Sequence, residues 1–240
     1  METTTVLQGY TDREKGAYLG AIASIATADH EASEEELEYI TALCDAAGIS
    51  DQQKQTVERA ATELSGEELQ RCLDILKTSE LKYSLVTDII TFSKSDSNYG
   101  EQEQQRVKEI SEYLGVDKKQ FSLLDEFTDK AAAEDIPAEE KVKPSFLSSL
   151  GLTDKMKSAG INTGGLLKGL LGMAGPFILS RMLSGSLRKG GNMLGGLGGA
   201  LGGGTGGMGG GLGSIIGMLS GGRGFGNAGG LFGRLLGGRR

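Results

Sequence analysis

Apolar residues recur every three to four positions through the first 130 residues, and no window alternates apolar and polar residues long enough to form a strand. This spacing predicts amphipathic helices. The first helix carries Tyr18, Ile22 and Ile25 on one face, and it starts at a capping box in which Thr11 and Glu14 bond each other's free backbone N–H groups. Six more helices are predicted at residues 33–47, 50–64, 65–76, 80–95, about 101–114 and 117–130. The predicted fold class is all-α, a bundle of about seven helices.

Part of this pattern occurs twice. When the sequence is shifted by 67 positions, Asp29 falls on Asp96 and Gly48 falls on Gly115. Apolar positions around them also coincide, and each glycine ends a predicted helix, where a left-handed residue is favoured. The acidic positions Glu34 and Glu36 fall on Glu101 and Glu103. We therefore predict a duplicated unit of helix, acidic turn, helix and closing glycine.

The two acidic turns, residues 29–36 and 96–103, follow the pattern Asp-(Gly)-x-x-Ser/Gly-x-x-Glu between paired helices. Over about residues 10–127 the chain resembles the TerB-like family, named after the tellurite resistance protein TerB of bacteria. It departs from the family pattern where Asp29-His30 and Asp96-Ser97 replace Asp-Gly. The resemblance implies a bacterial, non-enzymatic module linked to tellurite or stress resistance and to the inner membrane, with divalent cations held at the acidic turns.

Both turns are rich in oxygen ligands of the kind that Ca²⁺ or another hard divalent cation prefers. An EF-hand is excluded, because its twelfth position requires a glutamate and the chain has Ile40 and Val107 there. Acidic residues in the first turn of a helix also stabilise the helix dipole without any metal, so plain helix capping is the alternative. The candidate metal ligands are Asp29, Glu31, Glu35, Glu36, Asp96, Asn98, Glu101 and Glu103.

The sequence offers little support for catalysis. His30 is the only histidine, and no serine or cysteine motif accompanies it. Cys44 and Cys72 lie 28 positions apart on apolar helix faces, which fits no usual zinc spacing and predicts buried core thiols. We expect a protein that is not an enzyme and that has no cofactor other than a divalent cation.

Charge and glycine divide the chain into two unlike parts. Of the 40 glycines, 33 lie at or after Gly151, and residues 151–240 carry ten Lys/Arg and one acid, a net of +9. Because the whole chain carries −7, the first 150 residues carry −7 − 9 = −16. An acidic front of this kind argues against nucleic acid as a partner. Residues 1–10 lack the basic start and apolar run of a signal peptide, which predicts a cytoplasmic location. The family resemblance implies that this location is peripheral to the inner membrane.

We divide the chain into a helical bundle at residues 1–130, a linker with short helices at 131–160, and a glycine-rich, low-complexity tail at 161–240. Within the tail, residues 164–183 combine large apolar and basic residues without an acid, which indicates binding to a membrane surface or anionic lipid. Residues 190–222 have no charged side chain and include 18 glycines. This composition is also typical of a disordered, low-complexity chain that associates readily with other chains. The alternative function is therefore a structural or assembly protein whose tail self-associates or docks a protein partner.

Overall fold

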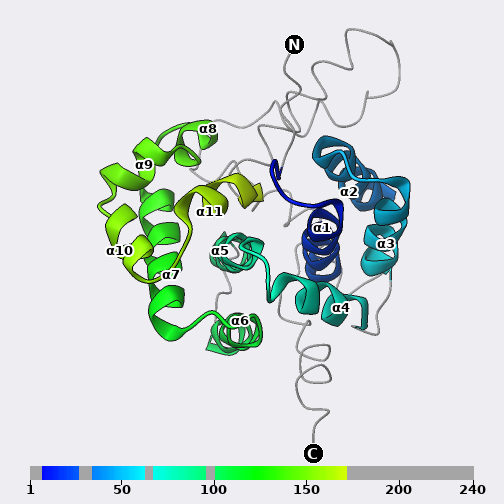
Figure 1. The fold of residues 1–240 in the computed structure, drawn as a ribbon, viewed down its shortest axis with the longest axis horizontal. Coiled ribbons are helices and arrows are strands. Elements are labelled where there is room, and N and C mark those ends of the chain that lie inside the picture. Colours follow the sequence, from blue (N-terminus) through cyan, green and yellow to red (C-terminus); the bar gives the residue numbers. More distant parts are fainter. Residues whose placement is uncertain (1–6, 27–33, 63–66, 96–100, 172–240) are drawn as a thin grey trace, which may run out of the picture.

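The computed structural model describes residues 7–26, 34–62, 67–95 and 101–171, and every regular element in these ranges is a helix (Figure 1). The predicted all-α class and the seven predicted helices are confirmed, and four short helices follow them. The helices are α1 (Asp12–Ala26), α2 (Glu34–Ala47), α3 (Asp51–Thr62), α4 (Glu67–Leu76), α5 (Leu81–Ser95), α6 (Glu101–Tyr113), α7 (Lys118–Ala133), α8 (Ala138–Lys141), α9 (Pro144–Ser149), α10 (Thr153–Ser158) and α11 (Thr163–Gly169).

The structure extends the duplication to three helices. The shift of 67 that places α2 on α6 also places the start of α3 on the start of α7. Gly48 and Gly115 both adopt a left-handed conformation, with φ of 62° and 73°. After each glycine, the next backbone N–H bonds back over the helix end, from Ile49 to the Cys44 carbonyl and from Val116 to the Ser111 carbonyl. Both copies thus end their second helix in the same glycine cap.

The third helix of each copy also starts in the same way. The Ser50 hydroxyl accepts from the backbone N–H of Gln53 at 3.4 Å, and the Asp117 carboxylate accepts from that of Gln120 at 2.8 Å. The Gln120 amide completes a capping box with Asp117. A short polar side chain before the helix satisfies an N–H group that would otherwise lack a partner, which is why both helices begin where they do.

Helix α1 packs closely between α3 and α4 because small residues line its surface. A Cβ atom on Gly20 would lie 2.9 Å from the Cys72 sulfur, and one on Gly16 would lie 2.1 Å from the Gln53 side-chain oxygen. The predicted capping box at the start of α1 is confirmed, because the backbone N–H groups of Thr11 and Glu14 bond each other's side chains at 2.9 and 3.2 Å.

The folded unit is longer than the sequence suggested. Residues 161–171, which we assigned to the tail, pack into the same core as the bundle, with α11 against α5 (Figure 1). Their leucines fill space beside α5, so the membrane-surface interpretation does not apply to them. Residues 131–160 form the expected short helices, but these helices also contribute to the core. The buried apolar residues of the C-terminal extension, residues 134–171 after α7, are Phe146, Leu147, Leu152, Met156, Ile161, Leu166, Leu167, Leu170 and Leu171.

Candidate functional site

Four of the eight predicted metal ligands lie outside the described residues. These are Asp29 and Glu31 in the first acidic turn and Asp96 and Asn98 in the second. The helices that follow the turns are described. Glu101 is the first residue of α6 and is exposed to solvent. Glu35 and Glu36 lie in the first turn of α2, and Glu103 lies in the first turn of α6. The side chains of these three residues do not belong to the described part of the structure.

The helices that lead into the two turns run in the same sense. Near the start of α1, a Glu14 carboxylate oxygen accepts a hydrogen bond of 2.6 Å from the hydroxyl of Ser79, just before α5 begins. One turn further along α1, the Tyr18 hydroxyl donates to the carboxylate of Asp88, well inside α5. The two helices therefore advance together, and their last residues, Ala26 and Ser95, point toward the same end of the bundle.

A buried carboxylate joins these two helices to the C-terminal extension. Asp88 has no exposed surface, and it accepts hydrogen bonds from the Tyr18 hydroxyl and, at 3.0 Å, from the Leu171 backbone N–H. Burial, followed by the negative charge of Asp88, raises the pKa of Tyr18 well above its ordinary value. Tyr18 therefore stays protonated and remains a hydrogen-bond donor to the carboxylate.

Sequence reasoning missed this contact, although a signal was present. Asp88 lies three residues after Leu85 and directly before Ile89, among the apolar residues of α5. A carboxylate at such a position is buried only when hydrogen-bond donors surround it. An acid within an apolar helix face thus indicates a donor from elsewhere in the chain, although it does not say which one.

Both cysteines are buried free thiols, as predicted. Burial raises the pKa of Cys44 to about 12 and that of Cys72 to about 12. A thiol must lose its proton to act as a nucleophile or to bind zinc. These side chains therefore act as small apolar residues of the core.

The described ranges contain no group of three or more His, Cys, Asp or Glu side chains placed to hold a metal ion. This search does not reach residues 27–33 and 96–100, where the predicted ligands of the two turns begin. Among the helices of the described part, none is both long enough and apolar enough to cross a membrane.

Comparison with known proteins gives one match. The sequence model of the family described as "Tellurite resistance protein TerB" matches residues 15–126, from the first turn of α1 into α7. This range contains both copies of the helix–turn–helix unit. No curated protein and no solved structure matches the chain.

Proposed function

Because residues 15–126 of this chain belong to the TerB family, we propose that the protein is a non-enzymatic module of a tellurite- or stress-resistance complex that binds divalent cations at its two acidic turns. The proposed ligands are the carboxylates and the amide of residues 29–36 and 96–103. Hard cations such as Ca²⁺ take six to eight oxygen ligands of this kind.

The duplication is the observation that carries this proposal. Two segments that share few identities keep the same acidic positions and the same glycine caps, and helices that run in the same sense lead into both turns. Helix capping alone requires one acceptor per helix start, whereas each turn offers about four oxygen-bearing side chains. A duplicated set of this size supports two similar cation sites.

Thermal unfolding of the full chain tests this proposal. A ligand that binds only the folded state stabilises it, by about 2.7 kcal/mol when its free concentration is 100 times its dissociation constant. We expect Ca²⁺ or Mg²⁺ to raise the unfolding temperature of the native sequence and to have no such effect on the double variant Asp29→Asn, Asp96→Asn. Asp135→Asn is the matched control, because Asp135 is exposed in the loop between α7 and α8. An equal rise in all three proteins would contradict the proposal.

The chain after Leu171 supports a second part of the proposed function, attachment to a membrane surface. Residues 172–240 carry seven Lys/Arg and no acid, interspersed with large apolar residues. Basic and apolar side chains together favour anionic lipid, and the attraction weakens with salt. We expect the full chain to sediment with vesicles that contain anionic lipid and to be released at high salt. A chain shortened to residues 1–175 should stay in solution. Equal sedimentation of both chains would contradict the tether.

The Gly–Leu runs of residues 190–222 favour self-assembly as the alternative function. This function predicts that the full chain forms oligomers in the absence of lipid, whereas residues 1–175 remain monomeric. Analytical ultracentrifugation over a wide concentration range distinguishes the two functions. A monomer at every concentration would exclude assembly through the tail.

A further inference from the structure

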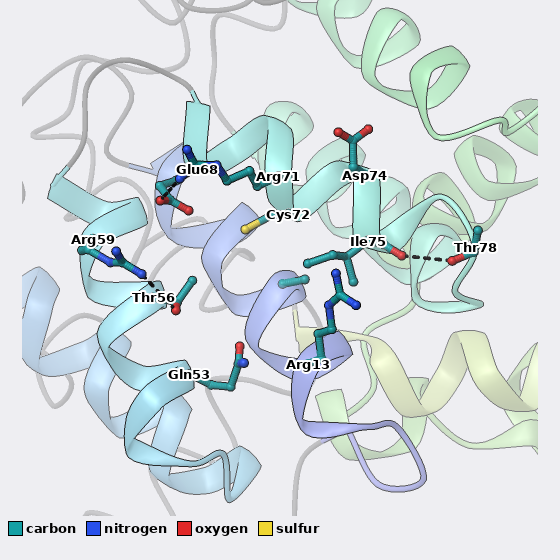
Figure 2. A pocket seen from close by; sticks show the side chains of 11 residues that line it. Arg13, Gln53, Thr56, Arg59, Glu68, Arg71, Cys72, Asp74, Ile75 and Thr78 are labelled. Atoms are coloured by element: carbon teal, nitrogen blue, oxygen red, sulfur yellow. Dashed lines mark hydrogen bonds and ion pairs between the residues drawn. The ribbon is translucent and has the colours of Figure 1, made fainter.

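A groove with a volume of about 710 Å³ lies where α1, α3 and α4 meet, and none of its lining residues belongs to an acidic turn (Figure 2). Each of these helices contributes one arginine to its lining: Arg13, Arg59 and Arg71. The volume falls in the range of small-molecule sites, about 300–1,000 Å³.

The choice of basic residue at this groove is selective. The first 150 residues contain four arginines and eleven lysines. Three of the four arginines line the groove, and no lysine does. Arginine presents a planar set of N–H donors that matches phosphate and carboxylate groups with two parallel hydrogen bonds, which lysine does not.

The positive charge of the groove is only partly balanced. Arg71 forms ion pairs with Glu68 at 2.5 Å and with Glu67 at 3.6 Å. Arg59 donates to the Thr56 hydroxyl at 3.4 Å, and neither Arg59 nor Arg13 has a carboxylate partner among the residues that the structure describes.

Asp74, the second acidic residue of the lining, has its partners outside the groove. The Asp74 carboxylate accepts from the Tyr113 hydroxyl at 2.6 Å and pairs with Lys77 at 3.4 Å. Figure 2 shows it pointing away from Arg13 and Gln53. Two guanidinium groups therefore remain available to an anion, in a domain whose net charge is strongly negative.

The base of the groove is apolar. Ala17 and Cys72 are each 2% exposed, and the partly buried Ile75 adjoins them. The Gln53 amide extends toward the middle of the groove from α3 (Figure 2). An apolar base with a few polar groups above it is the usual arrangement of a site for an organic ligand.

We propose that this groove binds a small organic phosphate, whose phosphate group contacts the arginines of the lining and whose apolar part rests on Ala17, Cys72 and Ile75. Bidentate contact with a guanidinium group supplies the affinity for the dianion, and the charge of the other arginine adds to it. The apolar base distinguishes an organic phosphate from inorganic phosphate. The acidic surroundings repel anions that do not make this contact.

Amide chemical-shift mapping on the full chain with phenyl phosphate and with inorganic phosphate tests the proposal. We expect phenyl phosphate to shift the amide resonances of the groove helices and to bind more tightly than inorganic phosphate. Arg13→Gln and Arg59→Gln should each weaken binding about tenfold, a change that corresponds to about 1.4 kcal/mol. Arg13→Lys should stay weaker than the native sequence, because it keeps the charge but loses the bidentate geometry.

Lys119→Gln is the matched control, since it removes the same charge from an exposed position on α7, outside the groove. It should leave binding unchanged. The proposal is overturned if Lys119→Gln weakens binding as much as the arginine variants do. It is also overturned if the shifts appear only in residues 172–240, or if phenyl phosphate causes none. These outcomes are separate from the cation experiment, because none of the substituted residues belongs to an acidic turn.

Discussion

The backbone N–H of Leu171 donates a hydrogen bond of 3.0 Å to the carboxylate of Asp88, which lies 83 residues earlier in the chain. Asp88 is completely buried, and a buried carboxylate is costly unless donors surround it. The Tyr18 hydroxyl supplies a second donor. One carboxylate thereby connects α1, α5 and the segment after α11, and the C-terminal extension becomes part of the domain's core.

This connection predicts that the domain loses stability when residues 161–240 are removed. A chain that ends at residue 160 lacks Leu166, Leu167, Leu170 and Leu171 and the Leu171 donor. Burial of one leucine side chain stabilises a fold by about 1.5–3 kcal/mol. We expect a free energy of unfolding in urea that is lower by at least about 4 kcal/mol, and a chain that ends at residue 175 should match the full chain. Equal midpoints for all three chains would contradict the account.

The contact between α11 and α5 predicts an unusually sensitive glycine. A Cβ atom on Gly169 would lie 2.2 Å from the Ser84 hydroxyl oxygen and 2.8 Å from a Leu81 methyl carbon. Ser84 also donates to the Leu166 carbonyl, so it cannot move aside without losing that bond. We expect Gly169→Ala to destabilise the domain by about 1–3 kcal/mol in urea unfolding, as overpacked cores do.

Gly164→Ala is the control for this prediction. Gly164 lies in the same helix, and its Cβ atom would meet only the Asn162 side-chain oxygen at 3.5 Å, an ordinary contact. Alanine is favoured over glycine in helices by about 1 kcal/mol, so this variant should be neutral or stabilising. If both substitutions had the same effect, close packing at Gly169 would not be the cause.

The raised thiol pKa values predict that the native protein resists thiol reagents. Cys44 and Cys72 are buried and have pKa values of about 12, so almost no thiolate forms at pH 8. Ellman's reagent should label neither residue within minutes in the native full chain and should label both in urea. Ser122→Cys places a thiol on the exposed face of α7 and should react at once. Rapid labelling of the native sequence would show that the core opens readily.

The capping box of α1 predicts a defined loss of stability in acid. Burial tends to raise the pKa of Glu14, but hydrogen bonds from Ser79 and Thr11 outweigh this effect and lower the pKa below 4.5. A group with a lowered pKa stabilises the fold above its unfolded-state pKa, and this contribution disappears as the pH falls through the folded-state value.

The native chain should therefore be more stable than Glu14→Gln at pH 7, and the difference should shrink below about pH 4.5. Urea unfolding from pH 3 to pH 7 measures it. Glu139→Gln, at an exposed position of α8, should show no comparable dependence. A constant difference between the native chain and Glu14→Gln over this range would exclude the carboxylate as its source.

The sequence predicted the parts of the fold that depend on local signals. Thr11, Gly48 and Gly115 mark helix ends through bonds to residues only a few positions away, and all three act as predicted. The shift of 67 also showed the duplication. Sequence spacing did not show what Leu166–Leu171 contact, because a leucine in a glycine-rich segment has the same pattern whether it meets lipid or α5.

The candidate sites could likewise be predicted from the sequence only where their residues lie close together along the chain. The groove arginines, Arg13, Arg59 and Arg71, come from three helices, and only tertiary packing places them around one space. The acidic turns could be found because their ligands lie within eight residues of each other. Their role in binding cations stays a prediction.

Calorimetric titration of Ca²⁺, Mg²⁺ and Zn²⁺ into the full chain tests the central claim most directly, because it gives the number of sites as well as their affinity. Two cation sites per chain are expected for the native sequence with Ca²⁺ or Mg²⁺, one each for Asp29→Asn and Asp96→Asn, and none for the double variant. If the double variant takes up the same number of cations as the native sequence, or if the native sequence takes up none, the turns are helix caps and the claim is wrong.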